Sequence, residues 1–126
     1  MVNLRARGFT LIELLVVLAV LATLLSIAVP RYFNSIDKSR EAALRQDLAV
    51  MRDAIDKYHG DRGMYPETLE DLVTNRYLRG IPVDPITETS ESWQIVPPPE
   101  GEKGAVYDVK SGAQGAARDG SDYAEW

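Results

Sequence analysis

A long apolar run near the start of the chain is followed by a mixed, amphipathic pattern. Residues 9–29 carry one charged side chain, Glu13, in 21 positions. A helix rises 1.5 Å per residue, so this run would be about 30 Å long, which matches the hydrocarbon core of a bilayer. The pattern therefore predicts a transmembrane helix.

Helical periodicity continues beyond this run. Pro30 lacks a backbone donor and predicts a kink or local melting near residues 26–30. The helix should then resume and end near His59, where the glycines of residues 60–63 allow a left-handed closure. Its apolar face recurs at helical spacing, too briefly for a coiled coil, so we expect it to pack on the chain's own domain. This face consists of Leu44, Leu48, Met51, Ile55 and Tyr58.

A second, short helix is expected to open at residues 65–67 and to stop at Gly80. Two prolines make residues 81–85 irregular. The apolar side of this helix comprises Leu69, Leu72, Val73 and Tyr77.

The last third of the chain reads as a small sheet and a loop. Residues 93–96 and 105–109 predict two short strands joined as an antiparallel hairpin. Residues 110–126 are rich in glycine and predict a loop, anchored by Tyr123 and Trp126. The fold class is therefore α+β, with a long N-terminal helix packed on a small antiparallel sheet.

Composition narrows the possible functions. The 126 residues include 14 Lys and Arg against 19 Asp and Glu, a net charge of −5, and no cysteine. This balance disfavours nucleic-acid binding, which uses clustered basic side chains, and the lack of cysteine excludes disulfides and cysteine-ligated zinc. The one histidine, His59, and the absence of a P-loop or HExxH motif predict that the chain is not an enzyme. The adjacent acids Glu70 and Asp71 are interpreted as part of a solvated face.

The residues ahead of the apolar run carry Arg5 and Arg7 and no acid. Such a head stays in the cytoplasm, which places the chain after residue 30 on the far side of the membrane. One interpretation is a secretory signal cleaved after Ala28, although the run is longer than an ordinary signal core. A second is a plain membrane anchor, with Glu13 reaching the interface.

A third interpretation rests on the hexad Gly8-Phe9-Thr10-Leu11-Ile12-Glu13, directly after the basic head. This hexad resembles the processing site of the type IV pilin and pseudopilin family. The resemblance implies that a prepilin peptidase cuts after Gly8 and methylates the new amine of Phe9. Three parts follow: a cleaved prepeptide (1–8), a transmembrane and filament-core helix (9–29) and an extracytoplasmic domain (30–126). A bend at Pro30 also looks like the family's spine helix.

Glu13 calls for a physical explanation of its own. A carboxylate about one turn inside a membrane helix costs about 2.5–3.5 kcal/mol, so a partner is expected. The amine of a processed Phe9 on a neighbouring subunit could pair with Glu13 and set the assembly register.

Further along, Tyr65-Pro66, Tyr77-Leu78 and residues 82–85, with a tail closing on Trp126, resemble the G-type major pseudopilin of type II secretion. The resemblance implies a homo-oligomeric filament, a short periplasmic pseudopilus, that drives protein secretion. Its implied partners are the prepilin peptidase and methyltransferase, minor pseudopilins, an inner-membrane platform protein and an assembly ATPase. The implied location is the bacterial inner membrane, crossed once, with the globular domain in the periplasm. A type IV pilus subunit for adhesion, motility or DNA uptake is the alternative, and a secreted binding module cut after Ala28 is a more distant one.

In the G-type branch a calcium ion holds the tail through acidic side chains and main-chain carbonyls. By this resemblance Asp119, Ser121 and Asp122 would be the calcium-binding residues here, with Ser111 a weaker candidate. Gln114 stands where an acid is common in that branch. The alternative is a solvated acidic turn at residues 119–120.

Overall fold

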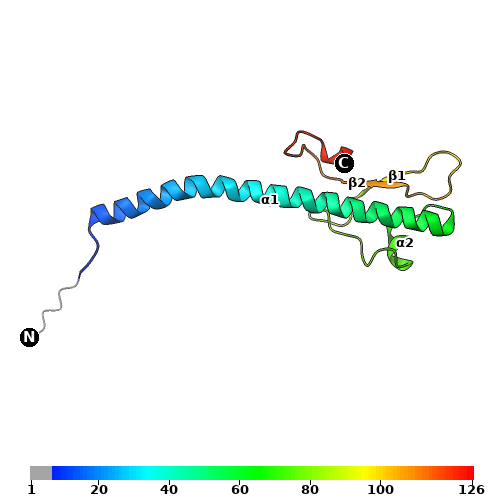
Figure 1. Ribbon diagram of the computed structural model, residues 1–126, viewed down its shortest axis with the longest axis horizontal. Helices are drawn as coiled ribbons and strands as arrows, with labels where there is room; N and C mark the ends of the chain where they lie inside the picture. Colours follow the sequence, from blue (N-terminus) through cyan, green and yellow to red (C-terminus); the bar gives the residue numbers. More distant parts are fainter. Residues whose placement is uncertain (1–6) are drawn as a thin grey trace, which may run out of the picture. The chain divides into compact units, whose positions relative to one another are not determined.

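The computed structural model describes residues 7–126 (Figure 1). Most of the expected prepeptide, residues 1–6, lies outside these described residues. The described chain divides into two compact units, the first ending at Ile36 and the second spanning Asp37–Trp126. A long helix and a small antiparallel sheet confirm the predicted α+β class. In chain order the elements are α1 (Leu11–Arg62), α2 (Leu69–Thr74), β1 (Gln94–Val96), β2 (Asp108–Lys110) and a 3-10 turn, η1 (Tyr123–Glu125).

The described part of the first unit is a helix whose side chains are almost all exposed and do not pack against the rest of the chain. The large apolar side chains from Leu11 to Val29 are 44–81% exposed. Two hydroxyls along this stretch are satisfied by the helix itself, because Thr23 donates to the Ala19 carbonyl and Ser26 to the Thr23 carbonyl. An apolar solvent could therefore surround this segment without leaving those hydroxyls unpaired.

The helix continues through Pro30 without interruption. The expected local melting was therefore wrong, because one missing donor removes a single helical hydrogen bond and the turns on either side persist. A kink at Pro30 stays a prediction.

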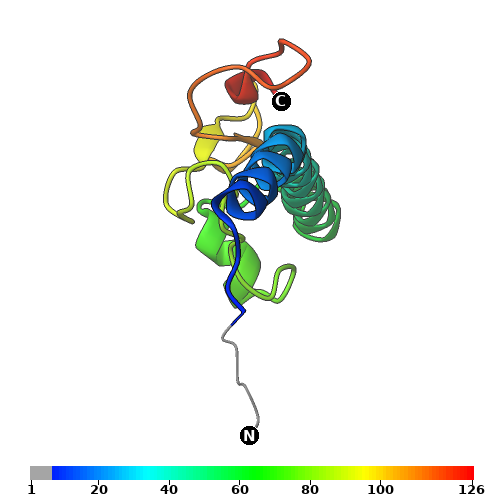
Figure 2. The same cartoon turned by 90° about the vertical axis from the view of Figure 1, so that its left-hand side faces the viewer.

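The second unit is built around α1 from Asp37 onward. The predicted apolar stripe, Leu44 to Tyr58, is buried, with no member more than 6% exposed, which confirms packing on the chain's own domain. Figure 2, which looks along α1, shows α2 and the C-terminal tail on different sides of the helix. The buried residues packed with the stripe are Leu69, Leu72, Leu78, Trp93, Val106 and Val109.

The end of α1 follows the glycine prediction. The helix stops at Arg62, and Gly63 adopts a φ of 69° while its N–H donates to the His59 carbonyl at 2.8 Å. This left-handed closure suits glycine, which has no Cβ to clash there.

The second helix is shorter than predicted. α2 begins at Leu69, because the Thr68 hydroxyl accepts from the Asp71 N–H while the Asp71 carboxylate accepts from the Thr68 N–H, a capping box. Asp71 is thus a helix cap as well as a solvated acid. The helix ends at Thr74 rather than at Gly80, because Arg76 turns the chain at a φ of 65°.

The sheet has two antiparallel strands, with Ile95 opposite Val109. The first strand is close to its predicted bounds, whereas the second begins three residues later than predicted, at Asp108. The reason is a long-range contact: the N–H groups of Ala105 and Val106 both donate to the Pro66 carbonyl, so these residues are not free to pair with β1.

The irregular segment and the tail complete the unit. Residues 81–85 are irregular as predicted, and Asp84 within them is fully buried. The Asp84 carboxylate accepts from the N–H groups of Ile86 and Thr87 and from the Ser111 hydroxyl. Tyr123 and Trp126 are partly buried against the core, which confirms that they anchor the tail.

Candidate functional site

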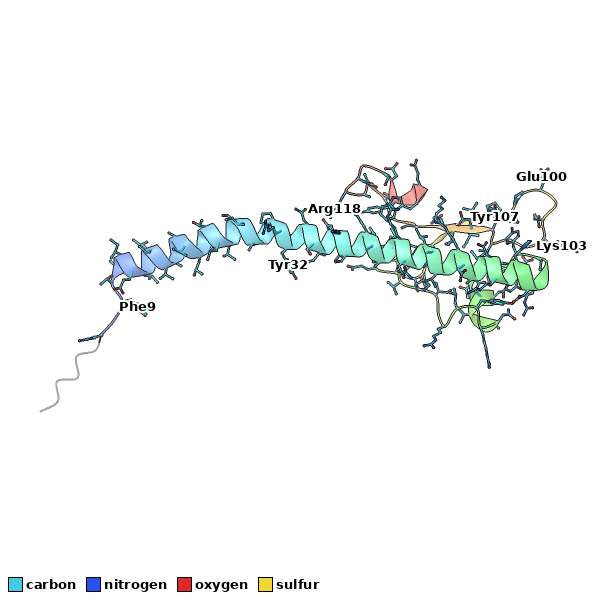
Figure 3. All side chains as sticks on the ribbon, in the orientation of Figure 1. Phe9, Tyr32, Glu100, Lys103, Tyr107 and Arg118 are labelled. Carbon is cyan, nitrogen blue, oxygen red and sulfur yellow. The ribbon has the colours of Figure 1, made fainter. Side chains whose placement is uncertain are left out.

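The Gly8–Phe9 bond lies ahead of regular structure. Residues 7–10 have no helical or strand assignment, and α1 begins at Leu11. Phe9 is 88% exposed, and nothing lies within 4 Å of the position that a Gly8 Cβ would occupy. Figure 3 shows the Phe9 side chain just ahead of the start of α1. A peptidase could reach this bond without first unwinding the helix.

Thr10 and Glu13 form the start of α1. The Thr10 hydroxyl accepts from the Glu13 N–H at 3.1 Å, and the Leu14 N–H donates to the Thr10 carbonyl at 3.2 Å. Thr10 is therefore the helix cap, a role that the sequence analysis did not assign, although a threonine three residues before a glutamate signals it. Glu13 lies in the first helical turn, where the partial positive charge of the helix N-terminus favours a carboxylate.

Among residues 7–126, one helix, α1, is long and apolar enough to cross a membrane. Its most apolar window has a mean hydropathy of 2.7, and none of that window is buried against other parts of the chain. A buried core helix would have shown the opposite, so this segment calls for a bilayer or for other helices around it.

The three candidate calcium residues are neighbours in the tail, and the side-chain oxygens of two of them, Asp119 and Ser121, are engaged. Asp119 Oδ1 accepts from both the N–H and the hydroxyl of Ser121, at 3.0 and 2.6 Å. Asp119 Oδ2 lies 3.6 Å from the guanidinium of Arg45. The hydrogen bonds from Ser121, with a smaller contribution from Arg45, hold the pKa of Asp119 below its usual value. Asp122 precedes η1 and makes no side-chain capping bond there.

Ser111 is not part of this group, because it is fully buried and its hydroxyl donates to Asp84. Within residues 7–126 no three acidic, histidine or cysteine side chains cluster as a metal site. Calcium prefers six to eight oxygens, and a guanidinium beside the best carboxylate opposes a second cation there. As placed, this donor set fits a guanidinium better than it fits a calcium ion.

Two arginines of α1 were not singled out from sequence. Arg52 donates to Asp108, to the Val109 carbonyl and to the Trp126 main-chain oxygen. The guanidinium of Arg45 lies 3.7 Å from the centre of the Trp126 ring. Both positions sit three or four residues from Leu48, so they flank the buried stripe, and this spacing is the signal that could have identified them.

His59, the one histidine of the sequence, makes packing and polar contacts within the second unit. Its ring stacks on Tyr65 with centroids 4.1 Å apart, and its Nε2 lies 3.6 Å from a carboxylate oxygen of Glu102.

The sequence is similar to proteins of one known family. The family described as the prokaryotic N-terminal methylation motif matches residues 3–29. Type II secretion system core protein G of Klebsiella pneumoniae is 30% identical to this chain, covering 97% of it and 95% of that protein. The proteins of the same name from Vibrio cholerae and Pseudomonas aeruginosa are each 30% identical, over 97% and 94% of this chain and 92% and 94% of their own lengths. No solved structure matches the chain closely enough for comparison.

The match at the N-terminus covers the hexad and the apolar helix, and the similarity to the core proteins extends over nearly all of both chains. It therefore includes the packed second unit and the tail as well as the processing motif. This chain belongs to the family of type II secretion system core protein G.

Proposed function

We propose that this chain is a major pseudopilin subunit, which polymerises into a short periplasmic pseudopilus that drives type II secretion. The observation that carries the proposal is the apolar half of α1, which is exposed along its whole length and is continuous with a helix packed into a folded unit. A soluble binding module has no use for such a segment. A filament subunit needs it twice, first in the bilayer and then in the filament core.

Processing is the first step. The open, non-helical Gly8–Phe9 bond supports cleavage by the prepilin peptidase on the cytoplasmic side, followed by methylation of the Phe9 amine. The prepeptide leaves with its two arginines, and the new amine carries a positive charge at the start of α1. The apolar helix is retained.

Glu13 then sets the register between subunits. Its carboxylate lies one turn into an otherwise apolar exposed helix, and an unpaired charge in such a helix costs up to about 2.5–3.5 kcal/mol, the value at the helix centre. The Phe9 amine of a neighbouring subunit, shifted along the helix axis, would neutralise it in a low-dielectric bundle. A subunit in any other register would leave both charges unpaired, so the pair selects one stagger.

Assembly exchanges lipid contacts for helix contacts. Small residues along the segment, among them Ala19, Thr23 and Ser26, permit close approach of neighbouring helices, and the two hydroxyls already bond to their own helix. The assembly ATPase and the inner-membrane platform protein would supply the work of extraction, and minor pseudopilins would start the filament. The second unit stays in the periplasm and forms the outside of the filament.

The test substitutes Glu13 in the native host and measures membrane insertion, N-terminal processing, filament yield and secretion of an exported enzyme. Glu13→Leu should leave insertion intact and abolish filaments and secretion. Glu13→Gln is the sharper variant, because it keeps the size of the side chain and its place after the Thr10 cap but loses the charge. If Glu13 only stabilises the start of α1, Glu13→Gln will still assemble.

Ile12→Leu, one residue away and apolar in both forms, is the matched control and should assemble normally. Normal filament yield from Glu13→Leu would contradict the register step. If the wild-type chain forms filaments but its deletion leaves secretion unchanged, the filament would instead be a type IV pilus.

A further inference from the structure

The C-terminal tail, residues 111–126, has little regular structure of its own. It contains the single turn η1 and one isolated bridge between Ala116 and Asp122. Apart from Ala113 and Ala117, its buried apolar surface comes from the partly buried Tyr123 and Trp126. Such a segment needs specific contacts to stay closed, and α1 supplies them.

Arg52 joins the two ends of the tail. Its Nε donates to Asp108 Oδ1 at 2.8 Å, while its Nη2 donates to the Val109 carbonyl at 3.0 Å and to the Trp126 main-chain oxygen at 2.8 Å. The side chain is about two-thirds buried. One planar guanidinium therefore holds β2, where the tail starts, and Trp126, where it closes.

Arg45 holds the outer part of the tail. Its guanidinium stacks on the Trp126 ring, 3.7 Å from the centroid, and lies 3.6 Å from Asp119 Oδ2. The Trp126 Nε1–H donates to the Ser121 hydroxyl at 2.7 Å, and that hydroxyl donates to Asp119 at 2.6 Å. Arg45, Trp126, Ser121 and Asp119 thus form a closed ring of contacts.

Glu41 adds a third contact from the same helix. One of its carboxylate oxygens accepts from the Arg118 N–H at 2.8 Å and from the Tyr123 hydroxyl at 3.1 Å. Glu41, Arg45 and Arg52 are four and seven residues apart, a spacing that puts them on one face of α1. Figure 3 shows Arg118 where the tail passes over this helix.

We propose that the tail is closed without a metal ion, by an arginine latch in which Arg52 and Arg45 supply the positive charge that a calcium ion would otherwise bring. The contacts already use the side-chain oxygens of Asp119 and Ser121, two of the three residues that a calcium ion would need. Asp119, the carboxylate best placed as a ligand, bonds to Ser121 and faces Arg45, and Gln114 offers no charge. The carboxylates of Asp108 and Asp119 are each matched by one guanidinium of α1.

The test uses the full-length protein purified in detergent and measures how fast trypsin cuts after Arg118, which is exposed within the tail. The loss of residues 119–126 is measured by intact-mass spectrometry, once in about 5 mM CaCl2 and once in excess chelator. Because cleavage of a transiently open segment tracks its open population, weakening the latch should accelerate it. The variants are Arg52→Ala, Arg52→Lys and Arg45→Ala. The control is Lys57→Ala, which removes an exposed basic side chain of α1 that pairs only with Asp53 among the ion pairs of residues 7–126.

The latch predicts equal cleavage rates for the wild-type protein with calcium and with chelator. It predicts that Arg52→Ala is cleaved about tenfold faster, because this variant loses the charged hydrogen bonds to the tail. Arg52→Lys should show a smaller increase in the cleavage rate, and Lys57→Ala should show no change. If Arg52→Ala does not fold, Arg52→Lys and Arg45→Ala carry the test. Slower cleavage of the wild-type tail in calcium would overturn the proposal, as would unchanged cleavage in both Arg52→Lys and Arg45→Ala.

Discussion

The buried pair of Asp84 and Ser111 gives the sharpest prediction about stability. Both residues are 0% exposed. The Ser111 hydroxyl donates to Asp84 Oδ2 and accepts from the Ala113 N–H at 3.1 Å. Ser111→Ala would therefore leave one carboxylate oxygen and one backbone N–H without partners, in a place that water cannot reach without rearrangement.

The size of the effect follows from those two losses. An unsatisfied buried polar group costs about 1–3 kcal/mol, so the two together should destabilise the second unit by about 3 kcal/mol. For a unit of about 90 residues this corresponds to a drop in Tm of about 10–20 °C. The assay is thermal unfolding of the full-length protein in detergent, followed by tryptophan fluorescence, because Trp93 and Trp126 both lie in this unit.

A double-mutant cycle separates the contact from general damage. Asp84→Asn removes the buried charge while keeping the shape, and its effect combined with Ser111→Ala should be clearly less than additive. A Tm within about 2 °C of wild type for Ser111→Ala, well under the expected loss of two buried partners, would refute the reasoning.

Two further predictions concern the same unit. Gly104→Ala should destabilise the second unit strongly, because the residue has a φ of 105° and the new Cβ would lie 2.1 Å from the Tyr65 carbonyl oxygen. Gly101→Ala, with a φ of 90° and open space around it, should cost only backbone strain, and equal Tm values for the two variants would contradict this. Asp47→Asn should raise the Tm at pH 7, because burial, and then the nearby Asp84, raise the pKa of Asp47 above its ordinary value of 3.8, so folding favours the protonated form. Asp47 therefore lowers the stability at any pH above its ordinary pKa of 3.8. The gain from Asp47→Asn should disappear in thermal scans at about pH 3, where Asp47 is protonated in the folded and the unfolded chain. A variant less stable than wild type at pH 7 would show that the Asp47 charge is favourable instead.

The sequence predicted the parts of this fold that depend on local pattern. The stripe from Leu44 to Tyr58 is buried as its spacing indicated, and a glycine closes α1 as expected. The errors came where distant contacts decide the outcome. β2 starts late because Ala105 and Val106 bond to Pro66, about forty residues earlier, which no local pattern reveals.

The end of α2 shows a different limit. Arg76 takes the left-handed conformation that is usually left to glycine, and the Tyr77 and Leu78 N–H groups then both donate to the Leu72 carbonyl. A non-glycine residue in this region is uncommon, so the first glycine, Gly80, was the natural but wrong prediction.

The candidate site also has a part that local sequence predicted and a part that depends on distant contacts. The hexad at residues 8–13 is contiguous, so sequence alone located it, and the family match at residues 3–29 agrees. The tail contacts are assembled from positions more than fifty residues apart, such as Arg52 with Val109 and Trp126. Charge pattern alone could not show that an arginine beside the apolar stripe would point at the tail.

The most direct test of the account is the intact mass and N-terminal sequence of the protein extracted from the membranes of its host. We predict a chain that starts at Phe9, with one methyl group on its amine, in the membrane fraction. That result would join the open Gly8–Phe9 bond and the exposed apolar helix to a single role, in which the helix is kept for the filament. A chain that starts at Val29 and is found in the soluble fraction would contradict it, because the helix would then have served only as a signal for export.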